Sequence, residues 1–174
     1  MIDRPTLFAE APRYCIDTNV VVSFLRGTED EHYGSDVFAP QWTFLETLME
    51  SGAIIAPRRV ETELLKWCPS IAALRQWLRR RKSMFRDVES DGQLASAKKI
   101  VNEYPVYGST ENYVGDLEVI TLADALQIAV LTLESRKPGG SRGRPKIPDV
   151  CAEFRIDCVS VSGFLRREHF GEDP

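Results

Sequence analysis

Closely spaced cysteines are absent from this sequence, because its four cysteines (Cys15, Cys68, Cys151 and Cys158) form no CxxC pair. A zinc site usually needs tighter ligand spacing, and a small disulfide-stabilised scaffold would be denser in cysteine. We therefore expect reduced cysteines in or near the core of a cytoplasmic protein.

Long apolar runs are also missing. No stretch approaches the ~18 consecutive apolar residues that a membrane span requires. The N-terminal segment MIDRPTLFAEAPR lacks the apolar core of a signal peptide. These absences predict a soluble, cytoplasmic protein with no membrane partner.

An excess of positive charge is absent as well. The formal net charge is −4, so the total gives no sign of a nucleic-acid-binding protein, and such a role would have to rest on local charge. The hydrophobic content of 43% and charged content of 28% are close to those of globular proteins and argue against disorder. The length of 174 residues suits one domain, residues 1–174.

Short continuous apolar runs alternate with segments of helical periodicity. Such strands are typical of a parallel sheet that is covered on both faces. We therefore predict an α/β fold, a three-layer α/β/α sandwich with a central, mostly parallel sheet. The expected strands are 14–16, 53–56, 129–132 and 158–160, and the expected helices are 18–26, 37–51, 59–67, 71–81, 93–103, 115–126, 148–154 and 162–168. The Gly- and Pro-containing stretch 136–146, RKPGGSRGRPK, is expected to be a loop.

Acidic residues follow the predicted strands. Asp17 comes directly after the first strand, Glu63 lies on the helix after the second, and Glu134 lies just beyond the third, while Asp116 begins the helix that leads into the third. Functional groups of such sheets collect at the carboxyl ends of the strands. Converging carboxylates form a set of hard oxygen ligands suited to Mg²⁺ or Mn²⁺, which can activate water and offset the charge on a phosphodiester.

Two sequence blocks carry a family resemblance. Residues 17–22, DTNVVV, with Leu25-Arg26-Gly27 behind them, resemble the opening signature of PIN-domain ribonucleases, which include the virulence-associated toxin ribonucleases of bacterial toxin–antitoxin pairs. Residues 60–64, VETEL, resemble the second block, a match that favours Glu63 over the neighbouring Glu61. Residues 132–134, TLE, resemble the fourth block, with Glu134 in place of the more usual Asp.

The third acid of the family has two candidates, Asp116 and Asp124. The segment ADALQIA around Asp124 has the stronger similarity to a typical sequence of the family. In the family, however, the third acid opens a helix of about three turns. Asp116 leaves room for such a helix before the third strand, whereas Asp124 leaves barely one turn. Helix length therefore favours Asp116.

The C-terminal part extends the resemblance. Residues 146–151, KIPDVC, resemble a block of a PIN-like family of unknown function, so the likeness covers a core of about residues 13–167. It implies an endoribonuclease in which Asp17, Glu63 and Asp116 hold Mg²⁺ or Mn²⁺ and Glu134 assists. It also implies RNA as substrate, a toxin role with a small antitoxin protein as partner, and a homodimer.

Residues next to the first acid are expected to support it. Thr18 and Asn19 can hydrogen-bond the Asp17 carboxylate and fix its orientation, or serve as the N-terminal cap of the helix. Ser23 lies one turn after Asn19 and is a further candidate for the same supporting role.

Two basic segments are candidates for binding RNA, since cationic side chains neutralise phosphates and aromatic rings stack on bases. The loop past Glu134 is favoured because it would lie at the mouth of the site, although such charges can also be merely solvated. The loop residues are Arg136, Lys137, Arg142, Arg144 and Lys146; the helical ones are Arg75, Arg79, Arg80, Arg81 and Lys82, with Trp77.

A second interpretation stays open. Glu134 departs from the family pattern and each signature is short, so the chain can also be a catalytically degenerate PIN-like domain that binds RNA or protein without turnover. A Rossmann-type nucleotide binder is disfavoured, because the turn after the first strand is Asp-Thr-Asn rather than glycine-rich.

Overall fold

The computed structural model describes residues 9–137, 139 and 142–172. Residues 1–8 of the N-terminal segment, and residues 138, 140 and 141 of the predicted basic loop, lie outside the described residues, as do residues 173–174.

The centre of the molecule is a five-stranded sheet in which every strand pair is parallel. The strand order is β3-β2-β1-β4-β5, so β1 lies in the middle, with Tyr14 paired to Ile54 on one side and to Ala129 on the other. The side chains of β1, β2 and β4 are all buried, which is why these strands read as unbroken apolar runs. The strands are β1 (Tyr14–Ile16), β2 (Ile54–Pro57), β3 (Phe85–Arg86), β4 (Ala129–Leu131) and β5 (Cys158–Val159).

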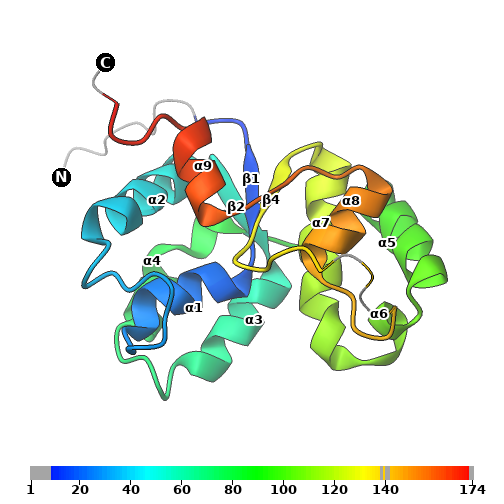
Figure 1. Cartoon of the computed structure of the whole chain (residues 1–174), viewed down its shortest axis with the longest axis horizontal. Helices are drawn as coiled ribbons and strands as arrows, with labels where there is room; N and C mark the ends of the chain where they lie inside the picture. Colours follow the sequence, from blue (N-terminus) through cyan, green and yellow to red (C-terminus); the bar gives the residue numbers. More distant parts are fainter. Residues whose placement is uncertain (1–8, 138, 140–141, 173–174) are drawn as a thin grey trace.

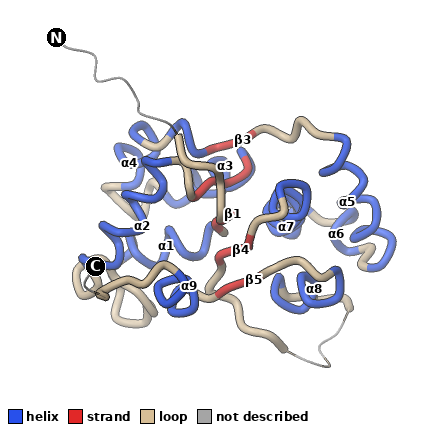
Figure 2. Tube along the Cα trace, turned by 90° about the horizontal axis from the view of Figure 1, so that it is seen from above, coloured by secondary structure: helices blue, strands red, loops and turns tan. Residues whose placement is uncertain are grey.

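Helices cover both faces of the sheet, which confirms the predicted three-layer α/β/α sandwich (Figures 1 and 2). One layer contains α1 (Thr18–Arg26), α2 (Ala39–Ser51), α4 (Leu74–Arg80) and α9 (Val161–Arg167), and the other contains α5 (Asp91–Glu103), α6 (Val106–Ser109), α7 (Val114–Leu126) and α8 (Ile147–Phe154). Short 3₁₀ turns, Lys82–Met84 and Glu111–Tyr113, precede β3 and α7.

Helix α3 (Arg58–Trp67) joins the two layers. It follows β2 directly and contacts α1 and α4 on one side and α7 on the other. A side chain near the middle of α3 can therefore reach the start of α1 and the start of α7 at once, and this position brings Glu63 into the site described below.

All predicted helices and strands are present, and their ends differ from the predicted ones by at most three residues. The helix predicted at 71–81 begins at Leu74, and α5 begins at Asp91 because Ser90 and Gln93 form a reciprocal capping box in front of it. Strand β3 and helix α6 were not predicted. Their two and four residues are too few to show a periodic apolar pattern.

Within the described part of the chain, no helix is both long enough and apolar enough to span a bilayer. The four cysteines are free, with Cys15 and Cys151 buried and Cys68 and Cys158 partly exposed, in line with the expected reduced state.

Candidate acidic site

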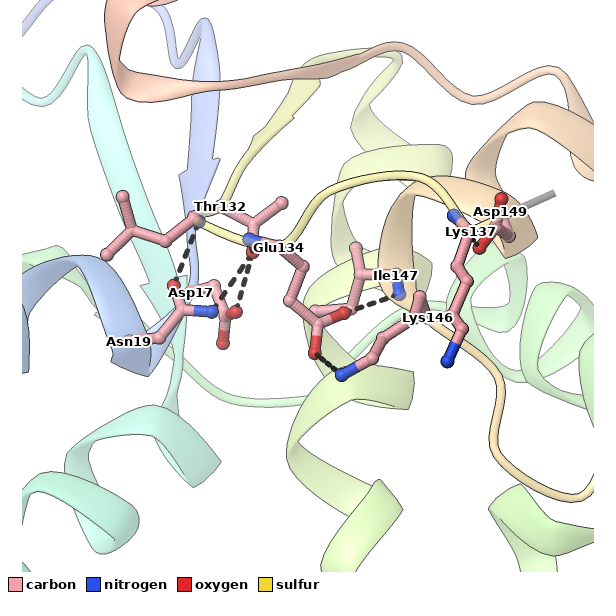
Figure 3. Close-up of polar contacts among 9 residues, drawn as sticks. Asp17, Asn19, Thr132, Glu134, Lys137, Lys146, Ile147 and Asp149 are labelled. Atoms are coloured by element: carbon pink, nitrogen blue, oxygen red, sulfur yellow. Dashed lines mark hydrogen bonds and ion pairs between the residues drawn. The ribbon is translucent and has the colours of Figure 1, made fainter. Parts of the chain in front are cut away.

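Asp17 lies at the carboxyl end of β1, at the centre of the sheet. It is 6% exposed, and its N–H donates to the carbonyl of Leu131 at the end of β4 (2.9 Å). The hydroxyl of Thr132 donates to the Asp17 Oδ2 (2.9 Å), as Figure 3 shows. The two central strands thus fix both the backbone and the carboxylate of Asp17.

Thr132 is the centre of a small hydrogen-bond network. Its hydroxyl also accepts from the Asn19 Nδ2 (3.2 Å) and from the Glu134 N–H (3.1 Å), and the Asn19 Oδ1 accepts from the Leu133 N–H (3.1 Å). Asn19 therefore acts on Asp17 through Thr132 and not by direct contact. This role of Thr132 was not predicted, although a polar residue at the end of a buried strand is a usable signal in the sequence.

Glu63 lies between Asp17 and Asp116. The Thr18 hydroxyl donates to the Glu63 Oε2 (2.5 Å), and the backbone N–H of Thr18 hydrogen-bonds the Asp17 carboxylate, so Thr18 supports Glu63 as well as the Asp17 carboxylate for which it was predicted. The Glu63 carboxylate also lies against the backbone of Gly115, where it takes the space that a Cβ atom would need. Glu63 thus contacts the immediate chain neighbours of both Asp17 and Asp116.

Asp116 lies in the first turn of α7. Its pKa is raised to about 8, first by burial and then by the carboxylates of Asp17, Glu134 and Glu63, while Lys146 opposes the rise. Asp124 lies in the last turn of the same helix, where it lines a separate pocket with Tyr14 and Ala129, the first residues of β1 and β4. Asp116 is therefore at the carboxyl edge of the sheet and Asp124 at the amino edge.

The charges of the site act on one another. The pKa of Asp17 is raised to about 7, mainly by burial and also by the carboxylates of Glu134 and Glu63, while the hydrogen bonds from Thr132 and from the Thr18 backbone oppose the rise. Glu61 takes no part, since its carboxylate pairs with Arg58 (2.9 Å). The acids favoured by the sequence therefore form one mutually repelling group, Asp17, Glu63, Asp116 and Glu134.

The Glu134 carboxylate is turned away from Asp17, as Figure 3 shows. One oxygen accepts from the N–H of Ile147, the first residue of α8 (2.8 Å), and the other from the Lys146 ammonium (3.2 Å). In this position the negative charge of Glu134 compensates the positive partial charge at the N-terminus of α8. It also joins the two ends of the basic loop 136–146.

The donor set fits a hard divalent ion in its chemistry, because it consists of carboxylates with an excess of negative charge. No three of the described His, Cys, Asp and Glu side chains, however, form a group that could hold one ion as they stand. Glu63 is engaged by Thr18 and Glu134 by α8, so ligation would require these two longer side chains to rotate.

A pocket of about 1020 Å³ opens beside Asp116 and Glu134. All five basic residues of the loop favoured for RNA binding contribute to its wall, together with Tyr104 and Tyr113. The basic residues are Arg136, Lys137, Arg142, Arg144 and Lys146. The acidic site is therefore continuous with a cationic and aromatic wall.

The cations of the wall differ in how they are paired. Arg136 pairs with Asp149 (3.5 Å), Arg142 pairs with Glu103, and Lys146 pairs with Glu134. The ammonium of Lys137 and the guanidinium of Arg144 form no ion pair with any residue that the structure describes. These two charges are the ones most available to an anionic ligand.

Two other sequence predictions lie away from the acids. The Ser23 hydroxyl accepts from the Tyr33 N–H (3.1 Å) and lies 3.4 Å from its carbonyl, so Ser23 holds the connection between α1 and α2 and does not contact Asp17. Trp77 on α4 is 7% exposed and donates to Glu46 (2.9 Å). It is a core residue and cannot stack on a base, and α4 belongs to the layer opposite α7 and α8 (Figure 2).

A family model described as "Domain of unknown function (DUF4411)" matches residues 14–171. The matched segment contains every acidic, hydroxyl and basic residue of the site described above. No curated protein matches the chain.

Proposed function

Since the chain belongs to the DUF4411 family, whose description names no activity, we propose a function from the site itself: divalent-metal-dependent cleavage of RNA phosphodiester bonds. The resemblance of the DTNVVV, VETEL and TLE blocks to PIN-domain ribonucleases supports the same proposal. The toxin role, the antitoxin partner and the homodimer rest on that resemblance alone and stay predictions.

The observation that carries the proposal is the position of the Glu63 carboxylate. It accepts a hydrogen bond from Thr18, the neighbour of Asp17, and lies against Gly115, the neighbour of Asp116. Three carboxylates from β1, α3 and α7 therefore gather at one edge of the sheet. Asp17 is buried and the other two are partly buried. Such charges of one sign need a cation, because their mutual repulsion and lost hydration otherwise disfavour ionisation.

Asp17, Glu63 and Asp116 would hold Mg²⁺ or Mn²⁺, with Glu134 assisting. A bound ion of this kind would supply activation of water and neutralisation of the charge that develops on a phosphodiester. Thr132 and Asn19 fix the orientation of the Asp17 carboxylate, as the hydrogen-bond partners of metal ligands commonly do.

The basic wall of the pocket fits a phosphate backbone. Lys137 and Arg144 carry unpaired charges within the described part of the chain, and their pocket includes Asp116 and Glu134. A phosphodiester bound there would be adjacent to the acids, while flanking phosphates would contact the cations.

A second candidate function is a binding module without turnover. The hydrogen bonds of Glu134 to Lys146 and Ile147 favour it, as does the lack of a ready three-ligand group among the described residues. In this alternative the basic pocket binds RNA or a protein, while the acids only shape the electrostatic field.

An RNA-cleavage assay separates the two functions. A single-stranded RNA should be cleaved with Mn²⁺ or Mg²⁺ and left intact with EDTA, and Asp17→Asn should lose cleavage while remaining folded. Glu61→Gln is the matched control, because it neutralises an acid of α3 that pairs with Arg58 outside the site. RNA binding without metal-dependent cleavage in the wild type would favour the binding module, and equal cleavage by Asp17→Asn would reject the assigned site.

A further inference from the structure

Tyr107 is a buried tyrosine whose hydroxyl has no hydrogen-bond partner among the described residues. It comes from α6 and is 1% exposed, and its ring packs edge-on with those of Tyr104 and Tyr113, at centroid distances of 6.3 and 5.4 Å. Buried hydroxyl groups almost always have a partner, because an unmatched one keeps the cost of its lost hydration. Packing alone would be served as well by phenylalanine, so the hydroxyl needs another explanation.

The Tyr107 hydroxyl is subject to the charges of the acidic site. Burial raises the pKa of this phenol above its ordinary value, and the carboxylates of Asp116 and Glu134 are the next largest causes, followed by Cys151 and Tyr113. Asp116 comes from α7, Glu134 from the segment after β4, Cys151 from α8 and Tyr113 from the turn before α7. Of these elements, α7 and the turn before it contact α6. Helix α6 lies next to α7 in Figure 2.

The Asp116 carboxylate, in turn, has no hydrogen-bond donor among the described residues. Its pKa is set by burial and by neighbouring charges, and no hydrogen bond from a described residue contributes to it. Asp17, by contrast, is held by the Thr132 hydroxyl. The site therefore contains a partly buried carboxylate without a donor among the described residues and, nearby, a buried hydroxyl without an acceptor.

We propose that Tyr107 is a positioning residue of the acidic site, whose hydroxyl donates a hydrogen bond to the Asp116 carboxylate when that carboxylate holds a divalent ion. The inference rests on the proposed function, because it assumes that Asp116 is a metal ligand. It gives Asp116 the supporting donor that Thr132 gives Asp17. A carboxylate with one oxygen held in this way presents the other to the ion in a fixed direction.

Calorimetric titration of Mn²⁺ into the full chain, together with urea unfolding without metal, tests the proposal on Tyr107→Phe. The variant removes only the hydroxyl, so metal-free stability should be unchanged or higher, while the affinity for Mn²⁺ should fall about tenfold or more. Tyr104→Phe is the matched control. Its hydroxyl belongs to the same aromatic row but donates to Glu153, so the control should keep the wild-type Mn²⁺ affinity.

The outcomes separate this inference from the proposed function. Equal Mn²⁺ affinity in wild type and Tyr107→Phe would overturn the role of Tyr107 while leaving the metal site intact. An equal loss in Tyr107→Phe and Tyr104→Phe would also overturn it, because the effect would then come from the aromatic row and not from this hydroxyl. Absence of Mn²⁺ binding in the wild type would overturn the proposed function and this inference with it.

Discussion

The Glu63 carboxylate occupies the space that a Cβ atom on Gly115 would need. Helix α3, which contacts both layers, thereby places Glu63 between the first turns of α1 and α7. The close approach is possible because residue 115 has no side chain. Gly115 is thus part of the site, although it has no functional group of its own.

Gly115→Ala should displace the Glu63 carboxylate without unfolding the chain, because the group that must move is the end of a flexible side chain. We expect the affinity for Mn²⁺ to fall about tenfold, as for other changes beside metal ligands. Calorimetry measures the affinity, and circular dichroism checks the fold.

Gly92→Ala is the matched control for this substitution. Gly92 is also the second residue of a helix, and its added Cβ would meet only Ala125 Cβ and Ser90 Oγ at ordinary contact distances of 3.7 Å. The control should bind Mn²⁺ like the wild type. Equal affinities in the two variants and the wild type would show that the position of Glu63 is irrelevant to the ion.

Thr132→Val should destabilise the chain by about 1–3 kcal/mol, because it leaves buried hydrogen-bonding groups without their partner. The Thr132 hydroxyl donates to Asp17 and accepts from Asn19 and from the Glu134 N–H. Urea unfolding measures the loss.

The buried Thr121 offers a comparison for Thr132, since its hydroxyl bonds only to the carbonyl of Glu118 within α7 (3.3 Å). Thr121→Val should therefore cost less. A Thr132→Val variant as stable as Thr121→Val would contradict the central place of Thr132 in the network.

The positions of the acids could be predicted from the sequence, because a small number of simple physical rules determine them. Continuous apolar strands separated by helices imply a parallel sheet, whose carboxyl ends share an edge, so an acid directly after a strand, such as Asp17, belongs to that edge. Helix length separated Asp116 from Asp124 in the same way, since the two lie at opposite ends of α7.

The supporting residues did not follow from the sequence, because their partners are set by tertiary packing. Thr132 acts across 115 positions of the chain, and Tyr107 comes from a four-residue helix without a periodic pattern. The direction of the Glu134 side chain depends on where α8 begins, which the surrounding loop does not reveal. Ser23 was assigned by spacing along a helix, but its hydroxyl bonds to a neighbouring loop instead.

Metal-free stability should fall as pH rises from about 5 to about 8. The pKa values of Asp17 and Asp116 are raised from 3.8 to about 7 and about 8, so in this range the folded chain keeps protons that the unfolded chain has already lost. Fewer bound protons in the unfolded state mean that the free energy of unfolding decreases with pH, by at most about 1.4 kcal/mol per pH unit for each group.

Urea unfolding with EDTA at several pH values measures this slope. Asp17→Asn should flatten it, since one of the two titrating groups is removed, and Glu61→Gln should leave it unchanged. Stability that rises with pH across this range would contradict the raised pKa values of Asp17 and Asp116.

Lys137→Gln combined with Arg144→Gln should weaken the binding of single-stranded RNA. Both side chains line the pocket and neither is ion-paired within the described part of the chain, so each can neutralise a phosphate. The slope of log affinity against log salt should decrease by about 0.7 for each lost phosphate contact. Fluorescence anisotropy at several salt concentrations measures it.

Arg75→Gln combined with Arg79→Gln provides the control with the same change in net charge. Both arginines are exposed on α4, in the layer opposite the pocket. If this pair weakened RNA binding as much as the loop pair, overall charge rather than the pocket would account for binding.

The most direct measurement is a titration of Mn²⁺ into the metal-free wild-type chain and into Asp17→Asn under the same conditions, followed by calorimetry. The account predicts saturable binding to the wild type and a loss of at least about tenfold in affinity in the variant, since a ligand at the centre of the sheet has been neutralised. A wild-type chain that binds no Mn²⁺, or a variant that binds it equally well, would contradict the account.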